Sequence, residues 1–206
     1  MTFSLSEVEA LSRKATRGAG FSWGIAEEAG KSVRWLCAWG LPGAEALARY
    51  LEDRNLAGLP PEGPVDLQAS SWTAAPARLC PLATGLAISD YGTRGDSLHQ
   101  HAVDWPILML PQIAWPGQVC SLSWMDTLIS WDGVLRISGA VMTPCADLVT
   151  LSPGVASLGQ PCPRASRANP MPQALHVLTH FAARTYAPET DASKRKGAGA
   201  GLVDRD

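Results

Sequence analysis

The chain has 206 residues, 46% of them hydrophobic and 17% charged, and its formal net charge is −2. This length favours a single domain with a substantial core, and the charge lacks the basic excess that binds nucleic acid. The longest apolar run, residues 107–115, is interrupted by proline and is too short for a membrane helix. The N-terminus carries an acidic residue where a secretion signal needs basic ones. We therefore expect a cytoplasmic protein that contacts neither nucleic acid nor membrane.

Residues 1–55 show the apolar spacing of three helices. Ser6 and Glu9 fit a capping box at the start of the first helix, which ends where glycines follow residue 17. Ser22 is the predicted N-cap of the second helix, whose apolar face is rich in alanine and glycine. Such small residues predict a close contact between helices. The third helix begins near residue 44 and fades near residue 55.

The middle of the chain predicts a sheet, preceded by an ordered loop over residues 57–76. Two runs with alternating polar residues stand before Asp132 and Gly133, and a third follows them. Asp-Gly between strands indicates a type I′ hairpin turn, because both central residues of that turn need positive φ. We therefore predict an antiparallel hairpin in which residues near Ile129 pair with residues near Leu135. Two further strands are predicted over residues 79–88 and 107–110.

The order of the predicted elements decides the fold class. Helices come first, strands follow, and a last helix covers residues 172–186 before a glycine-rich tail. This order is typical of an α+β fold with a mainly antiparallel central sheet, rather than of alternating strand–helix–strand units. We predict one domain over residues 1–206, made of a helical part (1–55), a loop and sheet part (56–168), a helix (169–187) and a glycine-rich tail (188–206).

Two glycine-rich segments are the candidate binding elements. Residues 17–24 join the first two predicted helices, where N–H groups at a helix start bind anions and Arg17 adds a positive charge. Residues 197–206 combine glycines with acidic residues. Together the segments predict a site for an anionic metabolite, with Glu27 or Asp204 as the catalytic acid–base group. The predicted ligand-binding residues are Arg17, Gly18, Gly20, Ser22, Trp23, Gly24, Gly199 and Gly201.

Each segment also has a plainer interpretation. The glycines of residues 17–24 would allow a tight corner between two helices, with Arg17 in water. A glycine-rich terminus is often solvent-exposed chain, and it can also dock on a protein partner or on a second copy of the chain. Neither a dinucleotide fingerprint nor a P-loop fits residues 17–24, since no strand precedes them and no Gly-Lys-Ser/Thr follows. We predict no cofactor.

The five cysteines lack the spacing of a metal or redox site, so reduced thiols are expected. Cys80, Cys145 and Cys162 each lie beside a proline in a predicted loop. One of these three could be a nucleophile if a base or a positive field lowered its pKa.

The histidines occur as two close pairs. His176 and His180 lie one helical turn apart, and His99 and His101 flank one residue in a predicted loop next to Asp96 and Asp104. The two pairs could form one metal or acid–base site if the fold brought them together. No glutamate follows His176, as the zinc-protease motif requires, and solvated or core histidines are the plainer interpretation. We therefore predict no metal site.

The chain contains eight tryptophans, a high number for its length. In the predicted sheet region such large rings ordinarily fill a core. The alternative is an aromatic box for a cation such as a quaternary ammonium group. The tryptophans of that region are Trp105, Trp115, Trp124 and Trp131.

The glycine-rich segments and the helix before the first of them also resemble a known family. Residues 5–11, 17–31 and 197–206 are similar to the bacterial family catalogued as domain of unknown function 3726. The tail of this chain differs from the family pattern at Val203 and Arg205. The resemblance implies a bacterial cytoplasmic protein and supplies no catalytic residue.

The leading hypothesis is a protein of bacterial metabolism that binds a small anionic metabolite and could be an enzyme. The alternative is a non-catalytic accessory subunit whose glycine-rich tail docks on a partner. The two hypotheses differ in geometry, because a metabolite site needs the predicted residues at a concave surface.

Overall fold

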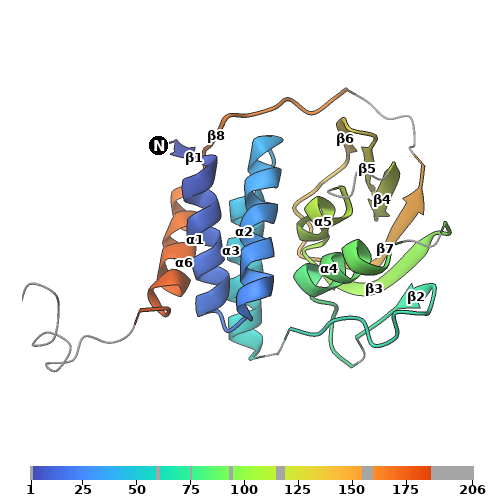
Figure 1. The fold of residues 1–206 in the computed structure, drawn as a ribbon, viewed down its shortest axis with the longest axis horizontal. Coiled ribbons are helices and arrows are strands. Elements are labelled where there is room, and N and C mark those ends of the chain that lie inside the picture. Colours follow the sequence, from blue (N-terminus) through green and yellow to red (C-terminus); the bar gives the residue numbers. More distant parts are fainter. Residues whose placement is uncertain are drawn as a thin grey trace, which may run out of the picture.

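The computed structural model describes residues 2–58, 61–74, 76–92, 95–114, 119–154 and 160–186. Its helices are α1 (Leu5–Gly18), α2 (Trp23–Ala38), α3 (Gly43–Ala57), α4 (Pro81–Tyr91), the 3-10 helix η1 (Pro106–Met109), α5 (Leu110–Ala114) and α6 (Pro172–Ala183). Its strands are β1 (Phe3–Ser4), β2 (Ser71–Trp72), β3 (Leu98–Asp104), β4 (Cys120–Trp124), β5 (Thr127–Trp131), β6 (Leu135–Ser138), β7 (Cys145–Pro153) and β8 (Arg167–Ala168). Helices α1, α2, α3 and α6 gather on one side of the molecule and the large sheet lies on the other (Figure 1). The predicted α+β class is confirmed.

Helices α1, α2, α3 and α6 form the helical half of the molecule (Figure 1). Helix α1 contacts α2 and α6, and α3 contacts the same two helices. The short strand β1, which leads into α1, pairs antiparallel with β8, which precedes α6. The last helix is therefore part of the same bundle as the first three.

Local capping chemistry fixes the helix starts. The Ser4 Oγ accepts a hydrogen bond from the Glu7 N–H (3.1 Å), and Glu7 Oε2 accepts one from the Ser4 N–H (2.7 Å). The capping box predicted at Ser6 and Glu9 was wrong by two residues, because α1 starts directly where the β1 pairing ends. The N-cap of α2 is Ser22, as predicted.

Glycines allow the helices to approach one another closely. A Cβ atom on Gly18, the last residue of α1, would lie 1.8 Å from the carbonyl oxygen of Phe181 in α6. A Cβ atom on Gly30 of α2 would lie 2.8 Å from the carbonyl oxygen of Glu9 in α1. Neither position has room for a methyl group. The close helix contact predicted from small residues in α2 is confirmed.

The large sheet has the strand order β2–β3–β7–β4–β5–β6. Strands β2 and β3 are parallel, and every other neighbouring pair is antiparallel. Leu122 of β4 pairs with Ile129 of β5 on one side and with Leu151 of β7 on the other, and all three are buried. The predicted mainly antiparallel sheet is confirmed.

Strands β5 and β6 form the predicted hairpin. Ile129 pairs with Ile137, and Trp131 pairs with Leu135. Three residues, 132–134, therefore connect the strands, and of these only Gly133 has positive φ, at +94°. The prediction of a type I′ turn was wrong, because a three-residue connection needs one left-handed residue rather than two.

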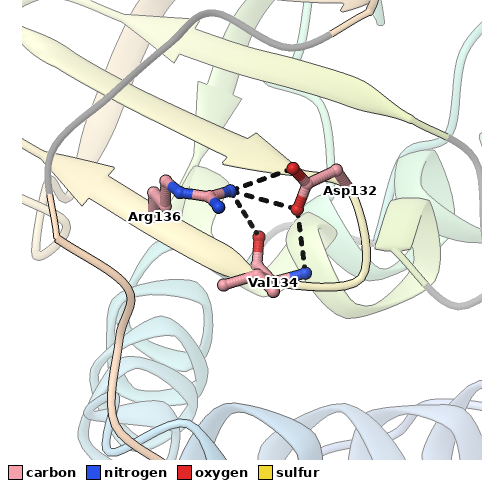
Figure 2. Close-up of polar contacts among 3 residues, drawn as sticks. All are labelled: Asp132, Val134 and Arg136. Atoms are coloured by element: carbon pink, nitrogen blue, oxygen red, sulfur yellow. Dashed lines mark hydrogen bonds and ion pairs between the residues drawn. The ribbon is translucent and has the colours of Figure 1, made fainter.

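An aspartate side chain holds the hairpin turn (Figure 2). Asp132 Oδ1 accepts hydrogen bonds from the Val134 N–H and from Arg136 Nη1, both at 3.0 Å. The Arg136 side chain lowers the pKa of the Asp132 carboxyl, and the Val134 N–H adds to this effect. The aspartate thus stabilises the turn by mimicking a backbone acceptor.

Two segments predicted as strands are helical. Residues 79–88 contribute most of α4, and residues 107–110 lie in η1 and the start of α5. These segments lie between the helical half and the sheet (Figure 1), so they are apolar on several sides and show neither strand nor helix periodicity. Helix α4 starts because Cys80 Sγ accepts a hydrogen bond from the Ala83 N–H (3.4 Å) and Pro81 follows the cap.

Strands β3 and β7 were not predicted, and the loop expected around the first histidine pair is β3. A buried polar residue hides the β3 pattern: Gln100 is fully buried, and its Nε2 donates to the Leu98 carbonyl oxygen (3.1 Å). Along β7 exposed and buried residues do not alternate regularly, and Leu148 faces solvent. Both strands lie inside the sheet, where their pairing depends on distant residues.

One cluster of buried apolar side chains joins the helical half to the sheet. Leu36 and Leu47 come from the helices, Ile107 from η1, and Leu122 and Leu151 from the sheet. Within the described part of the chain, no helix combines the length and the apolar character needed to cross a membrane.

Candidate functional site

The predicted binding corner lies between α1 and α2, and Arg17 clamps it. Arg17 Nη1 donates a hydrogen bond to the Phe21 carbonyl oxygen (2.7 Å). Its guanidinium carbon lies 5.2 Å from the centre of the Trp23 ring. Arg17 therefore spans the corner between α1 and α2. This agrees with the plainer interpretation of the segment as a tight corner, except that Arg17 contacts the corner itself.

The other corner residues have distinct positions. Gly18 packs against α6, Gly20 has a positive φ of +96°, and Ser22 Oγ accepts from the Ile25 N–H (3.4 Å). No atom lies within 4 Å of a Cβ placed on Gly24. Glu27 is exposed on the first turns of α2. The corner thus uses its glycines for a close helix contact and for a turn.

The remaining predicted site residues are in the tail. Gly199, Gly201 and Asp204 lie outside the described residues, as does the whole of residues 197–206. The predicted meeting of the tail with the corner stays a prediction.

A cavity of about 420 Å³ opens beside the corner. Its walls are the corner itself, the second half of α3 and the chain that follows α3. The corner therefore does face a concave surface, but the arginine that lines this surface is Arg54 of α3. The lining residues are Ala19, Gly20, Phe21, Leu51, Arg54, Asn55, Gly58 and Pro61.

Two aromatic rings hold Arg54 in place. Its guanidinium carbon lies 5.5 Å from the centre of the Phe21 ring and 5.6 Å from that of Tyr50. A guanidinium stacked in this way keeps its planar orientation and its permanent charge. Such a group is suited to pair with a carboxylate or a phosphate through two parallel hydrogen bonds.

Burial keeps the groups beneath Arg54 neutral. It raises the pKa of the Tyr50 hydroxyl and that of the Cys80 thiol, although the charge of Arg54 acts in the opposite direction on both. Cys80 is therefore a protonated, buried thiol that caps α4. The prediction that Cys80 could be a nucleophile was wrong for this reason.

A partly buried ion pair lies near the same arginine. Arg78 Nε contacts Asp104 Oδ1 at 2.5 Å. Burial nevertheless raises the pKa of the Asp104 carboxyl, while Arg78 and Arg54 lower it. The neighbouring Trp105 has a left-handed φ of +42°, and its Nε1 donates to Asp53 Oδ2 of α3 (2.9 Å). The strained backbone at Trp105 turns the chain out of β3. The hydrogen bond from its side chain to Asp53 connects the sheet to α3.

Sequence reasoning missed Arg54 and Arg78, and it considered Asp104 only as a neighbour of the first histidine pair. The three residues come from α3, from the segment before α4 and from the end of β3. No spacing in the sequence links these three elements, and the fold alone brings them near one another. The aspartate followed by tryptophan and proline at residues 104–106 was the only local signal, since proline is favoured at the first position of a helix.

The histidine pairs do not form a joint site. His99 and His101 lie on β3, whereas His176 and His180 lie on α6 at the opposite side of the molecule (Figure 1). His99 Nδ1 is 3.2 Å from Thr150 Oγ1, so it is engaged within the sheet. Within the described residues no group of three histidine, cysteine or acidic side chains could hold a metal ion.

Three of the four tryptophans considered as an aromatic box lie in the described residues, and each of these three has different partners. Trp105 donates to Asp53, and Trp124 Nε1 donates to Thr143 Oγ1 (3.1 Å). Trp131 contacts Trp35 and Trp39 instead, and Trp115 lies outside the described residues. An aromatic cluster exists, but most of it comes from Trp35 of α2 and from Trp39, the C-cap residue of that helix.

Comparison with known proteins identifies the N-terminal part of the chain. Residues 3–85 match the family model described as "Protein of unknown function (DUF3726)". No match was found among the curated proteins or among the solved structures. The matched segment contains the corner, all of α3 and every residue that lines the cavity beside Arg54.

Proposed function

We propose that the function of this chain, whose residues 3–85 match the DUF3726 family model, resides in the cavity beside Arg54, and that this cavity binds a small anionic metabolite. The observation that carries the proposal is that every lining residue of the cavity comes from the family segment. A volume of about 420 Å³ is in the range of small-molecule sites. We include in this proposal a cytoplasmic location in a bacterium, which five unpaired cysteines suit because the cytoplasm is reducing.

The charge of the cavity supports an anion as the ligand. Arg54 contributes a permanent positive charge, and its two ring contacts fix the direction of its N–H donors. Asn55 adds an amide to the same wall, with its Oδ1 accepting from Arg184 Nη1 (2.9 Å). No aspartate or glutamate is among the residues that line the cavity. A carboxylate or phosphate group in the cavity would therefore lie beside the guanidinium of Arg54, with no acidic side chain among the lining residues.

The role of Arg17 changes within this proposal. Its hydrogen bond to Phe21 and its contact with Trp23 hold the corner in shape. Phe21 in turn is one of the rings against which Arg54 lies. Arg17 therefore positions the wall of the cavity, and Arg54 is the charge partner of the ligand.

The proposal is tested by thermal shift with a panel of small carboxylates and phosphate esters. A ligand that binds the native state raises the melting temperature by mass action. We expect at least one anion to stabilise the wild-type protein, and we expect Arg54→Gln to weaken its binding by about tenfold or more. The matched control is Arg49→Gln, which removes an arginine from the same helix but from outside this cavity. Equal binding by the wild type and Arg54→Gln would refute the proposal.

Deletion of residues 197–206 separates this proposal from the accessory-subunit alternative. If the tail closes the metabolite site, the shortened protein loses the same thermal shift that Arg54→Gln loses. If the shortened protein keeps the shift, the tail has another task, such as docking on a partner. Its unliganded melting temperature should change little in either case.

A further inference from the structure

We propose that a second cavity, at the opposite end of the α1–α2 pair, binds a planar aromatic carboxylate through Arg164 and Trp35. This site is independent of the metabolite cavity, because α2 begins at the corner and the second cavity lies at its other end. The cavity measures about 380 Å³. Its lining residues are Glu9 of α1, Lys31, Arg34, Trp35 and Ala38 of α2, and Arg164.

Three tryptophans form the aromatic wall behind this cavity. Trp35 and Trp39 are one helical turn apart at the end of α2, and Trp131 ends β5. The ring centres lie 5.4 to 5.9 Å from one another, with tilted or edge-to-face planes. Trp35 lines the cavity and is only partly buried, so part of its ring surface can stack on a flat ligand.

The cluster keeps buried donors without acceptors. Trp39 is 7% exposed, and neither its Nε1 nor that of Trp131 has a hydrogen-bond partner among the described residues. Buried donors without partners destabilise a fold. These two rings support the aromatic wall from behind, and Trp35 is the tryptophan of the three that lines the cavity.

The backbone holds Arg164 over this wall. The segment that leads into β8 crosses the ends of α1 and α2 (Figure 1). Two hydrogen bonds anchor it on either side of the arginine, from the Cys162 N–H to the Leu135 carbonyl oxygen (2.7 Å) and from the Ala165 N–H to the Ala38 carbonyl oxygen (2.8 Å). The guanidinium carbon of Arg164 lies 4.4 Å from the centre of the Trp39 ring.

This arrangement selects an anion rather than a cation. Of the cations around the cavity, Lys31 pairs with Glu28 (2.6 Å) and Arg34 pairs with Glu9 (2.9 Å). No carboxylate of the described residues pairs with Arg164, whose guanidinium faces the indole and keeps its N–H donors in the plane around it. The position over the Trp39 ring where a cationic ligand would lie is thus occupied by the protein's own arginine. A ligand carboxylate meets the donors of Arg164 while its ring stacks on Trp35.

Titration of the whole protein with benzoate tests the site, followed by tryptophan fluorescence and by calorimetry. We expect saturable binding of benzoate, and much weaker binding of neutral benzamide, of acetate without a ring and of choline. Arg164→Gln should weaken benzoate binding by about tenfold or more, and Trp35→Leu should weaken it as well. The control Arg167→Gln removes an arginine three residues further on that contacts Thr2, and it should bind as the wild type does.

The calorimetric signal separates loss of binding from loss of quenching in the tryptophan variant. Absence of saturable benzoate binding to the wild type would overturn the proposal. So would unchanged affinity in Arg164→Gln, or choline binding that exceeds benzoate binding. Because the metabolite cavity contains neither Arg164 nor Trp35, Arg54→Gln should leave benzoate binding unchanged, so failure at one site is distinguishable from failure at the other.

Discussion

The helical half and the sheet are stabilised by different kinds of contact. Between helices the backbones themselves meet, and a Cβ atom on Gly18 or Gly30 would collide with a carbonyl oxygen of the next helix. In the sheet, large side chains such as Leu122 and Trp124 fill the interior, and the tight places are turns. The difference teaches that one added methyl group should destabilise these helix contacts more than the open hairpin turn at Gly133, where a Cβ meets no atom within 4 Å.

The largest expected effect is on thiol reactivity, which tests whether the two halves unfold together. Burial raises the pKa of Cys37, in the helical half, and of Cys120, in the sheet, to about 11 in each case. At pH 8 their thiolate fraction is then about a hundredfold below that of a thiol of ordinary pKa. Exposed Cys145 should therefore react with a thiol reagent first, and Cys145→Ser should remove that fast phase.

The same reagent used in increasing urea reports on each half. We expect Cys37 and Cys120 to become reactive at the same urea concentration, because one apolar cluster joins the halves. Peptide mapping of the labelled protein identifies each site. Labelling of Cys120 at a lower urea concentration than Cys37 would show instead that the sheet unfolds by itself.

Gly18→Ala should lower the free energy of unfolding by about 3 kcal/mol or more, because the new methyl group forces α1 away from α6. Urea denaturation followed by circular dichroism measures the change. The control is Gly24→Ala on α2, where the methyl group meets no atom within 4 Å and alanine favours the helix, so stability should stay the same or rise by up to about 1 kcal/mol. Equal destabilisation by both variants would contradict the proposed difference between the halves.

Gly133→Val should lower the free energy of unfolding by about 1–3 kcal/mol through strain alone. Its φ is +94° and the space around it is open, so the effect should be smaller than that of Gly18→Ala. Asparagine tolerates this conformation, and Gly133→Asn should therefore destabilise the protein less than valine does. A larger loss in Gly133→Val than in Gly18→Ala would reverse the comparison.

The smallest expected effect is the pH dependence of the same turn. The pKa of Asp132 is lowered from its ordinary value of 3.8, so its contribution to stability is full above that value and is lost as the pH falls through the lower pKa of the folded state. Asp132→Asn should therefore be less stable than the wild type near neutral pH. The two proteins should converge in urea denaturation below pH 3.8, and a difference that persists there would show that the ion pair with Arg136 is not its source.

Much of the helical half could be predicted from the sequence, because its signals are local. Ser22 caps α2 as expected, and the alanine and glycine spacing of α2 correctly indicated a close neighbour. The hairpin at Asp132 and Gly133 was predictable for the same reason. The buried segments 79–88 and 107–110 were mistaken for strands, since an apolar run without periodicity fits either structure.

The sequence indicated the region of the candidate site but not the charged residue that lines it. The glycine-rich corner does border a cavity, yet the charged group there is Arg54 rather than Arg17. Nothing in the sequence around Arg54 distinguishes it from other helix-surface arginines. Its orientation comes from Phe21 and Tyr50, and Phe21 lies in another element.

The contact between Gly18 and Phe181 also bears on how the chain is made. During synthesis α1, α2 and α3 leave the ribosome well before α6, with the whole sheet in between. The groove of the bundle that receives α6, floored by Gly18, must therefore stay uncovered while the sheet is translated. The nascent chain exposes apolar helix surface throughout that interval, and this surface is where we would expect a chaperone to bind.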